Sequence, residues 1–477
     1  MMVEVSAPGF SIDRVESLTL SMRANLPPTG HVRVRYDASV AAALGVCGSA
    51  VSIRMTLPGP IPVGQPVLAG TVSDAILRED GVAVLTVLGK SAQRDETVRV
   101  RSFGTGPGRV AIKSLSGIAE LLAGVGNSTR LSMPVSHLYQ FGRTDYEVLQ
   151  LLAGWHGLYL REDPTGTLCF ADHTDGALHT VPRSALVPRS TTLHVHKRPA
   201  GARCVSTDLL AEKTPSRPAN AAPCANPGTP LAAAAHSLGA CRPHDFYGGG
   251  AGLTDAERAG RAAAAVRGGL TAWRAVLNGP LATQVRVGDR LKLADSEITD
   301  VLLVRQSELT YTPAHRDSLS LAIDAVPVGP LGGIPVSATP GPVVAVIGTC
   351  LDDPDESGRA WVRVAFPWHE SGDGIWCPVA QATASKPGCG AAEVPAAGAS
   401  VVALLDPIGF DPPTIVGAIY RGAGGGQPTT GTRRILHASP GLRLDIDQET
   451  GTLTFQGKLI RFLGPVTISE TLDVKEE

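Results

Sequence analysis

The sequence predicts a mainly β protein with a few helices, built from several parts. Residues 358–420 consist of short apolar runs separated by turns rich in Gly, Pro and Asp, and no helix-length periodic segment interrupts them. The first hundred residues alternate polar and apolar positions with the period of half-buried strands, as in HVRVRY and TVRVRS. Further short alternating runs begin at Arg434, and the 54 glycines of the chain suit many tight turns.

Length and charge limit the classes of protein that the chain can belong to. Its 477 residues are enough for two to four domains. The 42 basic and 44 acidic residues give a formal charge of −2, so we expect no nucleic-acid partner and no anionic membrane surface. The chain begins MMVEVSAPGF, without the basic and apolar regions of a signal peptide, and no run approaches the length of a membrane span. We expect a soluble protein made in the cytoplasm, without stable membrane insertion.

The sequence contains no motif that predicts an enzyme, a cofactor or a metal site. The eight cysteines form no Cys-x-x-Cys pair and match no zinc spacing, so we expect small buried side chains. The group Trp368, His369, Glu370 and Asp373 offers metal-ligand types, but it falls in a predicted turn. We interpret it as an exposed, solvated loop.

One helix has a strong start signal. Thr144 and Glu147 have the spacing of a capping box, in which each side chain bonds the backbone N–H of the other residue. The apolar residues that follow share one helical stripe: Val148, Leu151, Leu152 and Trp155. Gly157 is expected to end the helix, and the next residues predict a β-hairpin that turns at 164–166.

The middle of the chain has a different composition. Residues 211–253 are rich in Pro, Ala and Gly and predict a long loop or insertion. Thr254 and Glu257 form a second capping-box pattern, which predicts an Ala- and Arg-rich helix that runs to about Leu277. Residues 285–312 then predict three strands.

A five-stranded barrel is expected between two linkers, 334–342 and 422–431. The candidate strands are 342–348, 360–366, 374–381, 399–405 and 413–420. Five strands suit an oligonucleotide/oligosaccharide-binding (OB) barrel. Nucleic-acid binding by such a barrel needs aromatic residues stacked on a basic groove, and residues 340–421 contain few basic residues and more acidic ones, so we expect a structural barrel. The barrel residues that we single out are Val362, Val364, Phe366, Trp376, Val402 and Ile415.

The tail has apolar residues in alternation with charged and polar ones. These positions are Leu442, Leu444, Ile446, Leu453, Phe455, Val466, Ile468, Leu472 and Val474. Strands this short are not stable alone, whereas strands from three chains that close into one prism would share a core and lose their free edges.

Several of these motifs resemble one family, the spike proteins of contractile injection machines. These are the VgrG proteins of type VI secretion, the spikes of extracellular injection particles, and the hub and needle proteins of contractile phage tails. The resemblance is strongest in the barrel, in WVRVAFPW at 361–368, IWCPVAQ at 375–381 and DPPTIVG at 411–417. In the preceding part, Thr144-Asp145 and VRVGDRLKL at 285–293 carry it.

The resemblance implies an organisation, a role and a set of partners. Residues 1–333 would form a hub of two barrel-like subdomains that docks on the inner tube. Residues 334–421 would form the OB barrel, and 422–477 a linker and a short trimeric β-prism or β-helix needle. The implied protein is a non-enzymatic homotrimer without catalytic, cofactor or metal residues. It is assembled into a baseplate and driven to or through a target envelope when the sheath contracts. Its implied partners are the inner tube protein, baseplate wedge proteins and a cargo effector.

A separate tip protein of the PAAR type is also implied. Some phage needles end in a His-x-His iron site, whereas the only histidine of this tail is His437, at its beginning. The alternative function is a tail module that binds or degrades cell wall or carbohydrate. A degrading enzyme needs paired carboxylates in a cleft, and the sequence locates none.

Overall fold

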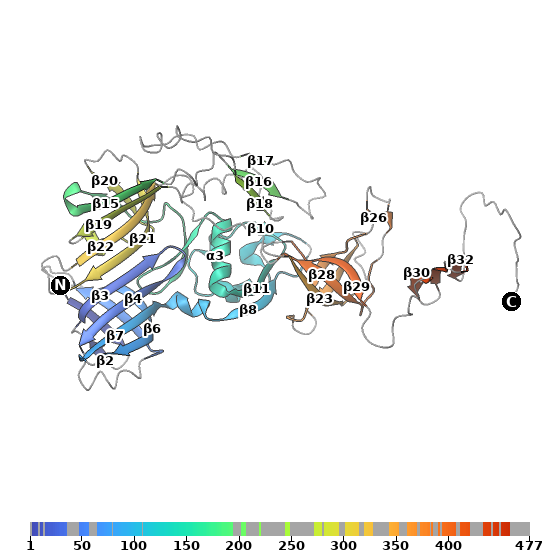
Figure 1. Ribbon diagram of the computed structural model, residues 1–477, viewed down its shortest axis with the longest axis horizontal. Coiled ribbons are helices and arrows are strands. Elements are labelled where there is room, and N and C mark those ends of the chain that lie inside the picture. The colour runs from blue at the N-terminus through green and yellow to red at the C-terminus, as the bar shows by residue number, and fades with distance from the viewer. Residues whose placement is uncertain are drawn as a thin grey trace, which may run out of the picture. The chain divides into compact units, whose positions relative to one another are not determined.

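The chain forms two compact units, Met1–Ala418 and Ile419–Glu477. The computed structural model in Figure 1 describes these residues: 2–7, 10–12, 15–35, 47–56, 64–78, 80–106, 108–193, 202–206, 219–220, 244–248, 271–278, 281–294, 301–313, 319–327, 343–352, 360–369, 373–381, 383–384, 390–391, 394–406, 411–419, 433–439, 442–447 and 450–457. Strands dominate these residues, as the sequence predicts. Within them, no helix has both the length and the apolar character needed to cross a membrane.

A curled sheet of 13 strands forms the first part of unit one (Figure 1). One half of it is antiparallel, in the order β3-β4-β7-β6-β5-β1-β2. Its strands are β1 (Met2–Ala7), β2 (Phe10–Ile12), β3 (Val15–Arg23), β4 (Leu26–Arg35), β5 (Ala50–Thr56), β6 (Gly64–Leu77) and β7 (Val82–Gly89). In β3 and β4 buried residues such as Leu18, Leu20, Val32 and Val34 alternate with half-buried or exposed ones, so this half encloses one side of a core.

The other half of the sheet comes from later residues. Its strands are β14 (Leu178–Val181), β15 (Leu186–Leu193), β19 (Thr271–Asn278), β20 (Arg290–Leu293), β21 (Leu302–Tyr311) and β22 (Leu319–Pro327). β21 pairs with β3 and sets Leu309 opposite Leu20, both fully buried. This pairing joins the two halves over one apolar core.

A helical layer follows the first half. α3 (Asp145–Trp155) begins with the predicted capping box, in which Thr144 Oγ1 accepts from Glu147 N at 3.2 Å and Glu147 accepts from Thr144 N at 2.9 Å. Gly157, at φ +69°, ends it in a Schellman arrangement, with Leu158 N donating to Ala153 O at 2.8 Å. The prediction for this helix and for its following hairpin, β12 (Tyr159–Glu162) with β13 (Leu168–Ala171), is confirmed.

Shorter elements complete this layer. β8 (Val98–Phe103) pairs with β11 (Leu138–Thr144) in a two-stranded ribbon. The others are η2 (Lys90–Asp95), β9 (Val110–Ala111), η3 (Ile112–Ser114), α2 (Ile118–Leu122), η4 (Ser128–Arg130) and β10 (Pro134–Val135). A further short helix, η5 (Arg183–Ala185), connects β14 to β15 in the sheet.

A closed five-stranded barrel ends unit one. Its strands run in the order β25-β24-β23-β28-β29, with bounds β23 (Val344–Cys350), β24 (Trp361–Ala365), β25 (Ile375–Pro378), β28 (Ser400–Leu405) and β29 (Thr414–Ile419). A parallel bridge from Val379 to Ile415, with Ala380 N donating to Ile415 O at 2.8 Å, joins the first and last strands. All five predicted strands are present. A small ribbon, β26 (Thr383–Ala384) with β27 (Gly390–Ala391), lies outside this sheet.

One prediction for the middle of the chain needs correction, and two others are described in part. The helix expected from Thr254 to Leu277 is wrong at its end, because 271–278 is strand β19, paired on both edges; residues 254–270 lie outside the described part. The stretch 211–253, expected to be a long loop or an insertion, contains two short strands, β17 (Ala219–Asn220) and β18 (His244–Gly248), which flank β16 (Ala202–Ser206). Of the three strands expected in 285–312, the structure describes two, β20 and β21; β20 follows α6 (Leu281–Gln284), and residues 295–300 lie outside the described part.

Unit two contains an antiparallel three-stranded sheet. Its strands are β30 (Arg433–Ser439), β31 (Leu442–Asp447) and β32 (Thr452–Gly457). The register sets Leu444 opposite Phe455 and Ile446 opposite Leu453. The predicted needle residues Val466, Ile468, Leu472 and Val474 lie outside the described residues.

Candidate assembly surfaces

We call the part of unit one that precedes the barrel, from β1 to β22, the hub. It contributes an aromatic side chain to the core of the barrel. Strand β11 alternates its residues, so that Leu138 packs under α3 while Tyr139 and Phe141 contact the barrel. Tyr139 is 1 % exposed and belongs to the same apolar cluster as Val362 and Ile375. Its hydroxyl has no hydrogen-bond partner, and burial raises its pKa well above the usual value. The hub and the barrel therefore share one packed core.

Hydrogen bonds from a barrel turn reinforce this junction. Ser102 Oγ in β8 lies 2.7 Å from His369 Nε2, and Trp368 Nε1 donates to the same hydroxyl at 3.4 Å. The backbone N–H of Phe366 donates to His369 Nδ1 at 3.1 Å, so Nε2 carries the ring proton and donates to Ser102. The solvated loop expected at His369 is therefore wrong: the imidazole is half-buried and joins barrel to hub.

A second histidine is buried beside this turn. His137 is 0 % exposed, its ring is parallel to that of Tyr139 at 6.2 Å, and neither ring nitrogen has a hydrogen-bond partner. Burial, with a smaller contribution from His369, lowers the pKa of His137 to about 3. His137 is therefore a neutral, apolar-packed imidazole.

Polar and charged side chains hold strand β11, which carries Tyr139, against β8 and α3. Arg101 donates to Asp145 at 2.8 Å and lies 3.0 Å from Glu120. Gln140, which is fully buried, donates to the same Asp145 oxygen at 2.8 Å. These bonds tie β8 and β11 to the first turn of α3. They hold β11 in place, so Tyr139 stays directed toward the barrel.

The barrel residues singled out in the sequence lie on two surfaces. Val362, Val364, Phe366 and Ile415 are buried in the core, together with the free cysteines Cys350 and Cys377. Trp376 and Val402 are only half-buried and lie outside that core. Sequence reasoning missed His137, Tyr139 and Ser102. The signal available was HLYQF, whose alternating aromatic residues indicate a strand with one apolar face.

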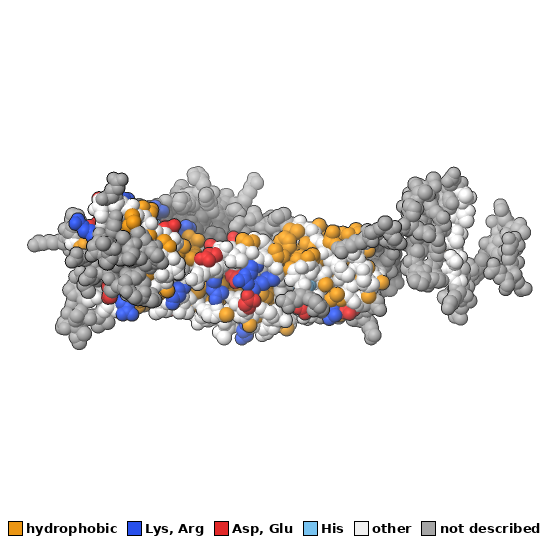
Figure 2. Space-filling model, turned by 90° about the horizontal axis from the view of Figure 1, so that it is seen from below, with side chains coloured by type: hydrophobic (Ala, Val, Ile, Leu, Met, Phe, Trp, Pro, Cys, Tyr) orange, Lys and Arg blue, Asp and Glu red, His pale blue; other side chains and the backbone are white. Residues whose placement is uncertain are grey.

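The outer surface of the barrel carries exposed apolar side chains (Figure 2). We call this the barrel face. It comprises Val343, Ile347, Val402, Leu404 and Val416, from β28, β29 and from β23 with the residue before it. Ile347 is 44 %, Leu404 40 % and Val416 47 % exposed, and the register pairs Ile347 with Val402. Neighbouring exposed apolar residues on one sheet face are typical of an interaction surface.

The C-terminal sheet also exposes apolar side chains. Every residue of β32 is exposed, including Leu453 at 52 % and Phe455 at 55 %. A three-stranded sheet of this length needs a packed face for stability. Among the residues that the structure describes, no group of three or more His, Cys, Asp or Glu side chains is arranged to hold a metal ion.

Several solved structures have a similar fold. The c3393 protein of E. coli, described as a component of the type VI secretion system with similarity to T4 phage tail proteins gp27 and gp5, aligns with a TM-score of 0.53 and 12% identity. The alignment covers 87% of this chain and 99% of that one. A Francisella PdpA–VgrG complex aligns with a TM-score of 0.56 and 9% identity, over 96% and 88% of the two chains.

A phage tail protein aligns over a shorter range. The 43 kDa tail protein of prophage MuSo2 from Shewanella oneidensis gives a TM-score of 0.50 at 14% identity, over 69% of this chain and 100% of that one. No protein-family model matches the sequence, and no curated protein matches it. In fold, this chain is similar to VgrG and other type VI secretion proteins and to phage tail proteins.

Proposed function

We propose that this chain is the spike subunit at the centre of a contractile injection machine. Three copies form the spike, with the curled sheet docked on the inner tube and the C-terminal strands wound into a needle that punctures the target envelope. The observation that carries the proposal is the fold similarity to type VI secretion and VgrG structures along 87% to 96% of the chain. Such a role is mechanical and needs no catalytic residue.

The exposed apolar side chains of unit two support a trimeric needle. Leu453 and Phe455 leave more than half of their surface in contact with water in the single chain. Burial against other copies would stabilise the assembly by roughly 25 cal/mol for each Å² of apolar surface removed from water. We propose the same for the predicted needle positions Leu442, Leu444, Ile446, Val466, Ile468, Leu472 and Val474.

The barrel face supports a collar of three barrels. Its residues lie on adjacent strands and form a group of large apolar side chains exposed to water, which is typical of an interaction surface. We propose that the barrel face of one copy contacts the next copy around the needle. Wedge proteins, a PAAR-type tip protein and a cargo effector complete the proposed set of partners.

The solution mass of the purified chain, measured by light scattering, tests the proposal. We expect three times the mass of one chain, and a lower mass after deletion of residues 429–477. The paired substitution Leu453→Ser with Phe455→Ser is expected to weaken the trimer without shortening the chain. A monomer whose C-terminal strands are nevertheless protected from hydrogen exchange would contradict the proposal. Binding or turnover of peptidoglycan by that monomer would favour a cell-wall module instead.

A further inference from the structure

Aromatic rings make up much of the contact between the hub and the barrel. His137, Tyr139 and Phe141 alternate along β11 and the residue before it, so they share the face that meets the barrel. From the barrel turn, Trp368 meets Phe141 edge to face, with ring centres 5.8 Å apart, and stacks on Phe366 at 5.0 Å. Two of the rings at this junction are imidazoles, whose charge depends on pH.

His137 lies in the junction without a partner for its polar atoms. The side chain is 0 % exposed, and neither ring nitrogen has a hydrogen-bond partner. A neutral imidazole fits this site, because it packs as one more aromatic ring against Tyr139. A protonated imidazole would carry a full charge and two N–H donors, and the site offers them no acceptor and no contact with water.

His369 cannot take up a second proton without losing a hydrogen bond. Its Nδ1 accepts from the backbone N–H of Phe366 at 3.1 Å, while its Nε2 lies 2.7 Å from Ser102 Oγ. A proton on Nδ1 would remove the acceptor and leave two N–H groups facing each other. The bond from Phe366 holds the barrel turn that packs on β8, so this proton would loosen the turn at the junction itself.

The charges around the two imidazoles do not compensate for a proton on either ring. Burial, with repulsion from His369 adding to it, lowers the pKa of His137 to about 3. Burial also lowers the pKa of His369, although Asp373 acts in the opposite direction. Both rings are therefore neutral in the closed junction at neutral pH.

Other charged groups near the junction act on different partners. On the hub side, the guanidinium of Arg101 lies over the ring of Phe103 at 5.0 Å and is paired with Glu120 and Asp145. On the barrel side, the groups that act on the hydroxyl of Tyr139 are Cys377, Asp411 and Asp406. The two histidines are therefore the groups whose protonated forms lose contacts at this junction.

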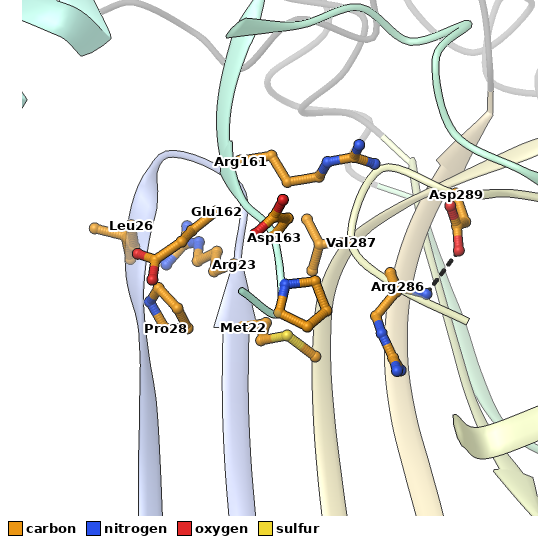
Figure 3. A pocket seen from close by; sticks show the side chains of 11 residues that line it. Met22, Arg23, Leu26, Pro28, Arg161, Glu162, Asp163, Arg286, Val287 and Asp289 are labelled. Carbon is orange, nitrogen blue, oxygen red and sulfur yellow. Dashed lines mark hydrogen bonds between the residues drawn. The ribbon is translucent and has the colours of Figure 1, made fainter. Parts of the chain in front are cut away.

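Acid acts differently on ionisable groups elsewhere in the hub. His179 lies 3.1 Å from the carboxylate of Asp289, so a charged ring has an anionic partner there. Glu162 lines the hub pocket in Figure 3, and burial raises its pKa, so the folded chain takes up this proton before the unfolded chain does. His156 is the exception, since its Nε2 accepts from Met133 N at 3.3 Å, and its protonation would loosen the hub rather than the junction.

We propose that the hub–barrel junction is an acid-sensitive joint, at which uptake of one proton from solvent by each of His137 and His369 releases the barrel from the hub. The hub and the barrel have separate apolar clusters, so each keeps its own core when the joint opens. The chain between β22 and β23 keeps the barrel attached. The joint is a property of the single chain and does not depend on the spike role.

Acid should change the balance between the closed and the open joint by a definite factor. An imidazole in water has a pKa near 6.5, whereas that of the buried His137 is about 3. The contribution of His137 to the closed joint is complete above about pH 6.5 and is lost as pH falls toward about 3. Between about pH 7.5 and about pH 5, the ratio of open to closed joint should rise about thirtyfold through His137 alone.

Fluorine NMR of the full-length chain, with fluorotryptophan in place of tryptophan, tests the joint directly. Trp368 lies in the junction, Trp273 is buried in the hub sheet, and Trp361 is buried at the far end of β24 from the barrel turn. Replacement of each tryptophan in turn by phenylalanine assigns the resonances. At about pH 5 we expect saturation transfer to detect an open species for Trp368, with Trp273 and Trp361 at their folded positions.

Variants of the two histidines identify the groups that take up the protons. His137→Leu keeps an apolar side chain and cannot be protonated, so the rise in the open-to-closed ratio should shrink about thirtyfold. His369→Gln provides an amide donor for Ser102 and should also reduce the rise. The exposed His31, changed to Gln, should leave it unchanged. The Trp273 and Trp361 resonances report that each variant is folded.

Three results would overturn the proposal. The first is movement of Trp273 or Trp361 together with Trp368, which would indicate that acid unfolds the hub or the barrel instead of opening the joint. The second is the absence of an open Trp368 species at about pH 5. The third is an undiminished rise in both histidine variants. The measurement needs neither a trimer nor a tube, so its failure is separate from failure of the spike proposal.

Discussion

Tyr139 is a buried aromatic residue whose hydroxyl forms no hydrogen bond in the structure. We expect Tyr139→Phe to leave the free energy of unfolding unchanged or slightly higher, because a buried hydroxyl without a partner is costly. Tyr139→Ala should cost about 3–5 kcal/mol, because it leaves a cavity between hub and barrel. Urea denaturation measures both. A large loss in the phenylalanine variant would mean that the hydroxyl has a partner.

His137 makes stability depend on pH. Its pKa in the folded chain, about 3, lies below the ordinary value near 6.5, so the unfolded chain takes up a proton first as pH falls. The stabilising effect is complete above about pH 6.5 and is lost progressively as pH falls toward about 3. His369, whose pKa burial also lowers, acts in the same direction.

The test compares unfolding midpoints at about pH 7.5 and about pH 5, a window in which most carboxylates stay ionised. His137→Leu should reduce the loss of stability on acidification. The exposed His31, changed to Gln, serves as the control and should leave that loss unchanged. Equal pH dependence in His137→Leu and the original chain would show that His137 is not buried in its neutral form.

At the scale of elements, α3 depends on its capping box. Thr144→Ala removes the acceptor for Glu147 N and also the donor to Asp95, 2.7 Å away. We expect a loss of about 1–2 kcal/mol in the free energy of unfolding, and recovery of most of it in Thr144→Ser. Urea denaturation of the two variants measures the difference. A serine variant as unstable as the alanine variant would mean that the threonine methyl group, rather than the cap, is important.

The sequence predicts elements whose start, end and periodicity depend on neighbouring residues. It does not predict elements whose conformation depends on pairing with strands far away in the chain. The capping box of Thr144 and the barrel strands follow from neighbouring residues and turns. The pattern at Thr254 has the same signal, yet the predicted helix fails at 271–278, where pairing with β15 and β22 outweighs helix propensity. The contact of Ser102 with His369 joins residues 267 positions apart, and no local pattern reveals it.

At the scale of the whole molecule, the barrel face can be tested separately from the needle. Leu404→Asp with Val416→Asp introduces charge at two exposed positions, so the single chain should keep its fold. If three barrels contact one another, the trimer of the double variant should dissociate at a higher protein concentration than the original trimer. Light scattering during dilution measures that concentration. Val98→Asp, at an exposed position of β8 that is 63 % accessible, is the matched control. Trimers of unchanged stability would remove the barrel face from the proposed interface.

The ring of Tyr139 inside the barrel also has a consequence for how a thrust would travel along the chain. A barrel joined to the hub only by its backbone connection would swing when pushed, and axial load would pass through that single strand of polypeptide. In this structure a compressive load would pass through side chains in van der Waals contact and the Ser102–His369 hydrogen bond, since close-packed interiors have low compressibility. Such a junction would resist pushing, while pulling would first break a few hydrogen bonds and withdraw the rings of Tyr139 and Phe141 from the barrel.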